Sequence, residues 1–293
     1  MNFLLAMFLA VAAPRASILV EPAWLAQHIK EPNLVLLHVG DKDEYAAGHI
    51  PGARFVSLND ISVSGEGEKG LMLEMPSEED LRQRLEKLGI SDNSRVVVYF
   101  GKDRISPTTR VVFTLDYAGL GARTSLLDGG QPTWVKNGGT LTKDAPPPRM
   151  GKLSPLKIQP IVVDAAFVKS HAGAKGFAVV DARDASYYNG VDTGEHMGEK
   201  QRTGHVHGAL SVPFTEPYDD GALRSPQALE ALFTKAGVKP GDTVIGYCHI
   251  GMQATAMLFA AKSLGHPVLL YDGSFQDWSR HTDYAVDNPT AKK

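Results

Sequence analysis

One stretch of the sequence decides the fold, and it reads Thr243-Val244-Ile245-Gly246-Tyr247-Cys248-His249-Ile250-Gly251-Met252-Gln253. Its first half is a largely apolar run, typical of a strand buried on both faces of a parallel sheet. A short loop follows, and residues 254–262 then have the composition of a buried helix. Cys248 is therefore predicted to lie on a loop between a strand and a helix.

The sequence around this stretch occurs twice. Residues 77–100 align without a gap with residues 225–248, at a constant spacing of 148. Both copies start at a helix-capping serine, pass through an amphipathic helix and a polar turn, and end in an apolar run. Further matches pair residues 48–53 with 204–209. Alternating strands and helices predict an α/β fold with two tandem domains, each a mainly parallel sheet flanked by helices.

The domain boundaries follow from composition. We predict a first domain over residues 18–142 and a second over residues 160–287, followed by a tail at 288–293. The linker between them, residues 143–159, includes three consecutive prolines that favour an extended connector.

The N-terminal residues resemble a targeting segment. Residues 3–13 form an apolar run that ends in small residues and is too short to cross a bilayer. Its length suits a secretory signal peptide, although no lysine or arginine precedes it. We predict a signal peptide over residues 1–17 and a periplasmic or secreted protein, the alternative being a cytoplasmic protein with a misassigned start.

Composition excludes several classes of partner. The 293 residues include 30 basic and 33 acidic side chains that are well mixed, for a net charge of −3. Such a chain has no broad basic surface, so we expect neither nucleic acid nor, in the mature form, a membrane as partner. Cys248 is the only cysteine and cannot form an intramolecular disulfide, so it is either a reactive thiol or an inert buried one.

The position of Cys248 favours a reactive thiol. A loop at a helix N-terminus can aim successive backbone N–H groups at one point, which stabilises a thiolate or a persulfide anion. The carboxyl end of a parallel strand is also where open α/β sheets bind ligands. The residues expected to form this cradle and to contact substrate are His249, Ile250, Gly251, Met252 and Gln253.

These motifs resemble the rhodanese family of thiosulfate and 3-mercaptopyruvate sulfurtransferases. The resemblance is carried by the tandem repeat, the Gly-His-Ile-Pro-Gly-Ala motif at 48–53, Asp128-Gly129-Gly130 with Trp134, and the cysteine loop, over nearly the whole chain after residue 17. It implies that Cys248 takes sulfane sulfur from a small anionic donor as a persulfide and passes it to a thiol or cyanide. No metal or other cofactor is implied.

The first copy is predicted to be inactive. Phe100 occupies the position of Cys248 and has no nucleophile, and the following loop, residues 101–110, is four residues longer by alignment. Arg183 aligns with a family arginine that helps to hold the anionic donor, and its counterpart in the first copy is Gly40. We therefore predict that Arg183 binds the donor, the alternative being a surface arginine.

The donor site departs from the family pattern. Thiosulfate-type relatives carry arginine and lysine directly after the cysteine, and mercaptopyruvate-type relatives carry glycine and serine, whereas this chain has His249 and Ile250. Tyr187 replaces a second expected arginine, which leaves Arg202 or Lys200 as candidate substitutes. His249, with an ordinary pKa of about 6.5, is predicted to supply a positive charge as the pH falls toward 6.

Three other functions compete with small-molecule sulfur transfer. A cysteine phosphatase of related fold needs an arginine six positions after the cysteine, where this chain has Ala254. A metal site at His196, His205 and His207 is not expected, because His205 belongs to the repeat motif that it shares with His49. A sulfur-relay protein, which delivers its persulfide to a protein partner, remains open.

Overall fold

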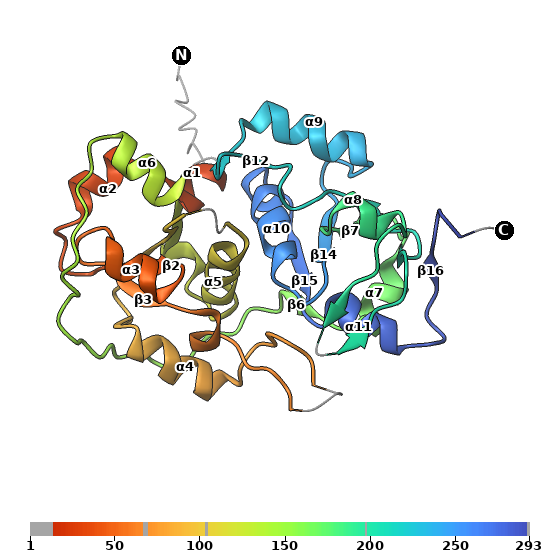
Figure 1. The fold of residues 1–293 in the computed structure, drawn as a ribbon, viewed down its shortest axis with the longest axis horizontal. Helices are drawn as coiled ribbons and strands as arrows, with labels where there is room; N and C mark the ends of the chain where they lie inside the picture. The colour runs from red at the N-terminus through yellow and green to blue at the C-terminus, as the bar shows by residue number, and fades with distance from the viewer. Residues whose placement is uncertain (1–13, 67–69, 103–104, 197, 292–293) are drawn as a thin grey trace, which may run out of the picture.

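Two α/β domains lie side by side in the computed structural model, which describes residues 14–66, 70–102, 105–196 and 198–291 (Figure 1). This arrangement confirms the predicted tandem fold. Most of the predicted signal peptide, residues 1–13, lies outside the described residues. No helix in the described part of the chain combines the length and the apolar character needed to cross a bilayer.

The first domain is built on five parallel strands in the order β1-β5-β4-β2-β3. The strands are β1 (Leu19–Val20), β2 (Leu34–Val39), β3 (Arg54–Val56), β4 (Arg95–Phe100) and β5 (Thr124–Leu127). The helices are α1 (Pro14–Ile18), α2 (Pro22–His28), α3 (Lys42–Ala47), α4 (Glu78–Lys87), α5 (Ile105–Tyr117) and α6 (Gly130–Lys136). Ser77 caps α4 as predicted, with its Oγ accepting a hydrogen bond from the Asp80 N–H.

The second domain repeats this sheet in the order β11-β7-β14-β15-β6, again all parallel. The strands are β6 (Val162–Val163), β7 (Phe177–Asp181), β11 (Leu210–Ser211), β14 (Thr243–Tyr247) and β15 (Val268–Tyr271). The helices are α7 (Ala165–His171), α8 (Ala185–Tyr188), α9 (Pro226–Ala236), α10 (Gln253–Ser263) and α11 (Ser274–Arg280). Three antiparallel pairs are added, namely β8 (Glu195–His196) with β9 (Glu199–Lys200), β10 (His205–Val206) with β16 (Val286–Asp287), and β12 (Tyr218–Asp219) with β13 (Ala222–Leu223).

Both faces of each sheet are buried, which explains the continuous apolar runs. In β4, alternate side chains enter different clusters: Val96, Val98 and Phe100 pack with α4 and α5, whereas Val97 and Tyr99 pack with α2 and α6. Because successive side chains of a strand point to opposite faces of the sheet, one strand contributes apolar side chains to the core on each face.

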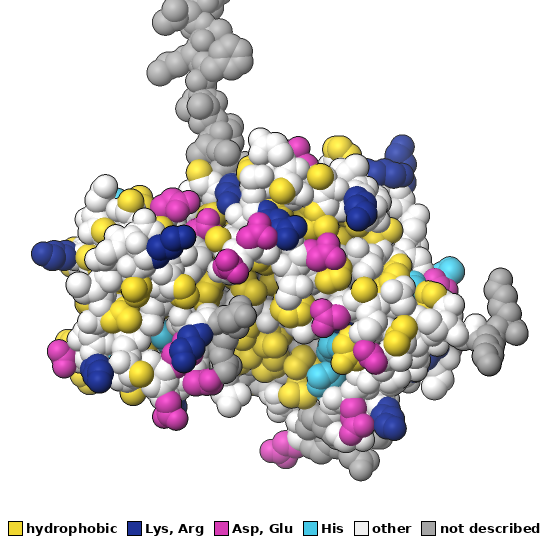
Figure 2. Space-filling model, turned by 45° about the horizontal axis from the view of Figure 1, so that its top comes forward, with side chains coloured by type: hydrophobic (Ala, Val, Ile, Leu, Met, Phe, Trp, Pro, Cys, Tyr) yellow, Lys and Arg dark blue, Asp and Glu magenta, His cyan; other side chains and the backbone are white. Residues whose placement is uncertain are grey.

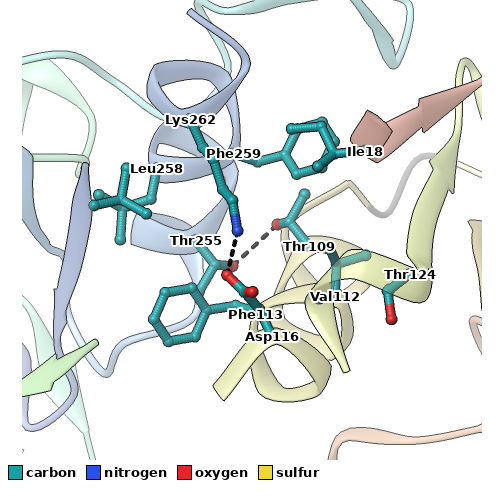
Figure 3. Close-up of a pocket in the computed structure, with 12 residues that line it drawn as sticks. Ile18, Thr109, Val112, Phe113, Asp116, Thr124, Thr255, Leu258, Phe259 and Lys262 are labelled. Carbon is teal, nitrogen blue, oxygen red and sulfur yellow. Dashed lines mark hydrogen bonds and ion pairs between the residues drawn. The ribbon is translucent and has the colours of Figure 1, made fainter. Parts of the chain in front are cut away.

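The two domains share one core where α5 packs against α10 (Figure 1). The contact is nearly symmetric, because Thr109 hydrogen-bonds Thr255 at 3.0 Å and Asp116 pairs with Lys262, each across a spacing of 146 residues (Figure 3). These polar pairs sit among apolar side chains that include Phe113. The two repeats therefore meet through equivalent helices.

The extra residues of the first copy lie in a different place from that predicted. Four residues separate Phe100 from the start of α5, and four separate Cys248 from the start of α10. The prediction of a longer loop before α5 is therefore wrong. The additional residues lengthen α5 and the turn after it, which a comparison of β-strand positions alone could not resolve.

The connector between the domains is docked on the first domain. Gly151 N–H donates to the Glu86 carbonyl at 2.7 Å, and Leu153 N–H donates to the Glu86 carboxylate at 2.9 Å. The Leu153 and Leu156 side chains are buried in the shared core. Beyond its extended prolines, the connector therefore helps to fix the position of α4.

The ring of Phe100 generates a stability prediction. It is 1% exposed and packs so closely that a Cβ placed on Gly130 or Gly221 would lie 2.7 or 2.6 Å from its atoms. Phe100→Ala should lower the free energy of unfolding by about 3–5 kcal/mol, because it leaves a cavity, as measured by urea denaturation. The exposed Val135→Ala is the control, and an equally small effect of both changes would contradict this packing.

Candidate active site

Cys248 directly follows β14 and lies ahead of α10, as predicted, with a fully buried side chain. The carbonyl groups of its loop are held by other elements. Four carbonyl oxygens of the loop accept hydrogen bonds. Cys248 O accepts from Phe275 N–H at 3.0 Å and His249 O from Gln276 N–H at 3.0 Å, while Gly251 O accepts from Arg110 Nη1 at 3.0 Å and Met252 O from Thr255 Oγ1 at 2.7 Å. These contacts fix the peptide planes of the loop.

The backbone N–H groups of the same loop are left without partners. Within the described residues, none of those at 249–252 donates a hydrogen bond. The first N–H groups of α10 have no partner within the helix either. Gly251 adopts the left-handed conformation, with φ +78°, that the turn requires. The loop therefore has the free donors that an anion-binding cradle needs.

Ser274 ties Cys248 to the adjacent strand end. Its Oγ accepts a hydrogen bond from Cys248 N–H at 3.1 Å and donates to the Tyr271 carbonyl at 2.9 Å. Ser274 has φ +52°, an uncommon backbone conformation for a residue with a Cβ, and the equivalent Gly130 has φ +56°. The second copy thus keeps the glycine-like conformation while gaining a hydroxyl that holds the cysteine backbone.

Arg183 lies beside the site in a buried ion pair. Its Nε and Nη2 donate to both carboxylate oxygens of Asp181, its Nη2 also donates to Gly204 O at 2.7 Å, and it stacks 4.0 Å from the Phe275 ring centroid. The arginine is 1% exposed. Burial lowers its pKa, but the charge of Asp181 outweighs burial, so the pKa of Arg183 is raised. Arg183 is therefore not a surface residue, and its binding of the donor stays a prediction.

His249 does not provide the positive charge that the sequence suggested. Its Nδ1 lies 2.9 Å from Gln201 Oε1, and Gln201 Nε2 donates to the His249 carbonyl at 3.2 Å. Burial, the charge of Arg183 and the neighbouring His196 lower the pKa of His249 to about 3. The expectation of protonation near pH 6 is therefore wrong, because the histidine is enclosed rather than solvated.

Compared with the first copy, the second copy has an extra polar loop at about residues 189–203, and side chains of this loop make specific contacts. Arg202 Nη1 donates to the carbonyls of His281 and Tyr284 at 3.1 and 2.7 Å, so it holds the chain after α11. Lys200 is exposed. His205 stacks on Tyr188 at 3.7 Å. Sequence reasoning missed Gln201, since a glutamine in a polar insertion carries no signal of its contact with His249.

The first domain contributes a buried arginine to the site. Arg110 of α5 pairs with Asp272, at the end of β15, at 2.5 Å, and donates to the carbonyls of Gly251 and Leu73. The spacing of 148 residues that relates Phe100 to Cys248 also relates the starts of α5 and α10, so Arg110 corresponds to Leu258 and the second repeat has no equivalent arginine. Asp272 also accepts the Met75 N–H at 2.9 Å. The cysteine loop is thus held in part by the copy that lacks a cysteine.

Glu74 is a second titratable group at this junction. Its Oε1 is buried without a hydrogen-bond partner. Burial and the negative charges of Asp272 and Asp277 raise its pKa to about 7, against the opposing charge of Arg110. Glu74 therefore changes charge near neutral pH beside the ion pair that supports the loop.

Among the described residues of the first copy, the corresponding site has neither the thiol nor a counterpart of the Arg183–Asp181 pair. Tyr247 Oη accepts from Val206 N–H and donates to Asp181, whereas Tyr99 Oη accepts from Ile50 N–H and lies 3.1 Å from His38 Nδ1. A Cβ on Gly40 would lie 2.9 Å from His38 Nε2, which leaves no room for an arginine there. The same tyrosine scaffold thus carries a neutral histidine in place of an ion pair.

The comparisons with known proteins agree with this architecture. A family model described as the rhodanese-like domain matches residues 21–137 and again residues 164–281. The chain belongs to the rhodanese family. This membership confirms the class expected from the sequence, an enzyme of the rhodanese transferase type with two such domains.

Curated rhodanese relatives match along nearly the whole chain. A thiosulfate sulfurtransferase of Pseudomonas aeruginosa is 30% identical over 92% of this chain and 97% of its own. A 3-mercaptopyruvate sulfurtransferase of Escherichia coli is 29% identical over 90% of this chain and 95% of its own. A sulfur carrier protein of Thermus thermophilus is 30% identical over 89% and 93%.

Among solved structures, this rhodanese resembles an anaerobic ergothioneine biosynthesis enzyme from Chlorobium limicola bound to trimethyl histidine. The TM-score is 0.81 at 22% identity, covering 94% of this chain and 71% of that one. At this identity the likeness establishes the shared fold.

The Arg110–Asp272 pair makes a stability prediction. Arg110→Met should lower the free energy of unfolding by about 3–5 kcal/mol, because it leaves a buried carboxylate unpaired. The double variant Arg110→Met with Asp272→Asn should recover part of this loss in urea denaturation. Arg224→Met, which breaks an exposed pair with Asp219, is the control and should change stability little. A double variant no more stable than the single one would contradict the pairing.

Glu74 makes a prediction about pH. The pKa of Glu74 is about 7 in the folded protein and 4.5 in the unfolded chain. Between these two pH values the unfolded chain therefore loses the proton of Glu74 more readily than the folded protein does, which favours unfolding as the pH rises. Stability should therefore fall across this window, and Glu74→Gln should remove ~2 kcal/mol of the fall. Thermal unfolding at a series of pH values measures it, and a variant with an unchanged pH profile would refute the assignment.

Proposed function

We propose that Cys248 is the sulfur-carrying nucleophile of a sulfurtransferase. The observation that carries this proposal is that the backbone N–H groups of residues 249–252, in the loop directly after Cys248, donate no hydrogen bond within the described structure. The Pseudomonas and Escherichia relatives, named thiosulfate and 3-mercaptopyruvate sulfurtransferases, support the same reaction class.

The reaction is a double displacement. The Cys248 thiolate attacks the outer sulfur of the donor, the S–X bond breaks, and the leaving group departs with the electron pair, as sulfite from thiosulfate. The persulfide formed on Cys248 is stabilised by the N–H groups of its loop. A thiol or cyanide then attacks the outer sulfur, and the Cys248 thiolate leaves.

A second candidate function is sulfur relay to a protein partner. It is favoured by the sulfur carrier protein of Thermus thermophilus, which is as similar to this chain as the Pseudomonas sulfurtransferase. In that role the persulfide would form normally, while turnover with small acceptors would be slow. The two functions are separated by loading the persulfide on Cys248 and then measuring how fast small thiols remove its outer sulfur. Fast removal favours the sulfurtransferase, and slow removal favours the relay.

We infer that the chain is exported and is cleaved before Arg15, which ends the signal peptide earlier than residue 17, the end predicted from the sequence. The apolar run at residues 3–13 supports export. Arg15 donates to the carbonyls of Arg224 and Leu223 at 2.6 and 2.8 Å and lies 3.8 Å from Asp128. Cleavage near Ala12 retains these contacts, whereas cleavage after Ala16 removes them.

The nucleophile makes the central prediction. Treatment with a sulfur donor should add the mass of one sulfur atom to the wild-type protein and none to Cys248→Ser, because serine cannot hold a persulfide. Turnover should be abolished with the fold retained. The matched control places a thiol at the equivalent strand end by adding Phe100→Cys to Cys248→Ser, and this variant should stay inactive. Retained turnover in Cys248→Ser would overturn the mechanism.

A further inference from the structure

The two guanidinium groups placed around the Cys248 loop in the described structure are each neutralised. Arg183 is bound to both carboxylate oxygens of Asp181, and Arg110 to Asp272, and all four side chains are buried. Glu74 adds a further carboxyl group close to Arg110. A doubly charged donor at the loop would therefore meet ion pairs rather than unpaired cations. The attraction to these neutral pairs would offset little of the free energy that the donor loses when its hydration is removed.

The side chain that follows the cysteine is uncharged and presents an acceptor. Because Gln201 Oε1 can only accept, the Nδ1 of His249 carries the proton in the 2.9 Å contact between them. The pKa of His249, about 3, keeps the ring neutral, so its Nε2 bears a lone pair. A lone pair disfavours an approaching anionic oxygen.

The loop after Cys248 also carries two apolar side chains. Ile250 and Met252 are half-buried. Residues 71–75 of the first domain are tied to the adjacent strand end and helix, with Met72 N–H donating to Gln276 Oε1 at 3.0 Å and Met75 N–H to Asp272. Figure 2 shows hydrophobic side chains gathered in the hollow between the two domains. Apolar surface therefore lies on the same loop as the unpaired N–H groups.

We propose that the preferred donor is an organic sulfane-sulfur compound with an apolar substituent and at most one negative charge, of the thiosulfonate or organic persulfide type. This inference rests on the proposed function of Cys248. For a thiosulfonate, the Cys248 thiolate bonds to the outer sulfur, the sulfur–sulfur bond of the donor breaks, and the sulfinate leaves with the electron pair. Charge balances, since two monoanions give a persulfide anion and a sulfinate.

The first test compares benzenethiosulfonate with thiosulfate at fixed pH and saturating thiol acceptor. The wild-type kcat/KM should be at least about tenfold higher for benzenethiosulfonate, because its ring buries apolar surface and it carries one charge fewer. A value for thiosulfate equal to or above that for benzenethiosulfonate would overturn the proposal.

The second test alters the loop itself. Ile250→Lys should raise kcat/KM for thiosulfate several-fold and lower it for benzenethiosulfonate. Ile250→Met should keep the wild-type preference, because it keeps the apolar contact. Met150→Lys, at a side chain that is 67% exposed on the connector, adds the same charge elsewhere and should leave the ratio unchanged. An equal change of the ratio in both lysine variants would contradict a local effect.

Mass spectrometry of Cys248 distinguishes failure of this proposal from failure of the proposed function. If both donors load sulfur on Cys248 but thiosulfate is preferred, only the donor class is wrong. If neither donor loads sulfur, the function proposed for Cys248 fails as well.

Discussion

The orientation of the peptide groups that follow Cys248 is the constraint on which the rest of the site depends. Their carbonyls are fixed by α11, by α10 and by Arg110 of α5. Because these contacts set the orientation of each peptide group, the N–H groups stay without a partner. Backbone donors without a partner in the protein are uncommon, and they persist here because the outer contacts hold the loop. The chemistry around the thiol is therefore set by groups that do not touch it.

Burial of charge is the second feature that shapes the site. Arg183 with Asp181, and Arg110 with Asp272, are paired so closely that each carboxylate serves as a structural anchor. Removing one member of such a pair is expensive, whereas losing both members costs less. The first copy follows this rule, because His38 and Gly40 replace the residues equivalent to Asp181 and Arg183 together.

Much of the fold could be predicted because its signals are local and occur twice. The capping serines, the apolar strands and the loop at Cys248 each depend on a few neighbouring residues. The contacts of Arg110 could not be predicted, since its equivalent is Leu258 and no repeat signal marks it. The low pKa of His249 also escaped prediction, because its burial depends on Gln201, far away in sequence.

Because Arg110 belongs to the first repeat and holds the cysteine loop of the second, the site of one repeat depends on a residue of the other. After a duplication, a copy that loses its nucleophile is ordinarily free to diverge. Here helix α5 of the silent copy supplies a guanidinium that holds Gly251, while the neighbouring segment offers the Leu73 carbonyl and the Met75 N–H. A substitution in the repeat that has no thiol can therefore disturb the loop that carries Cys248.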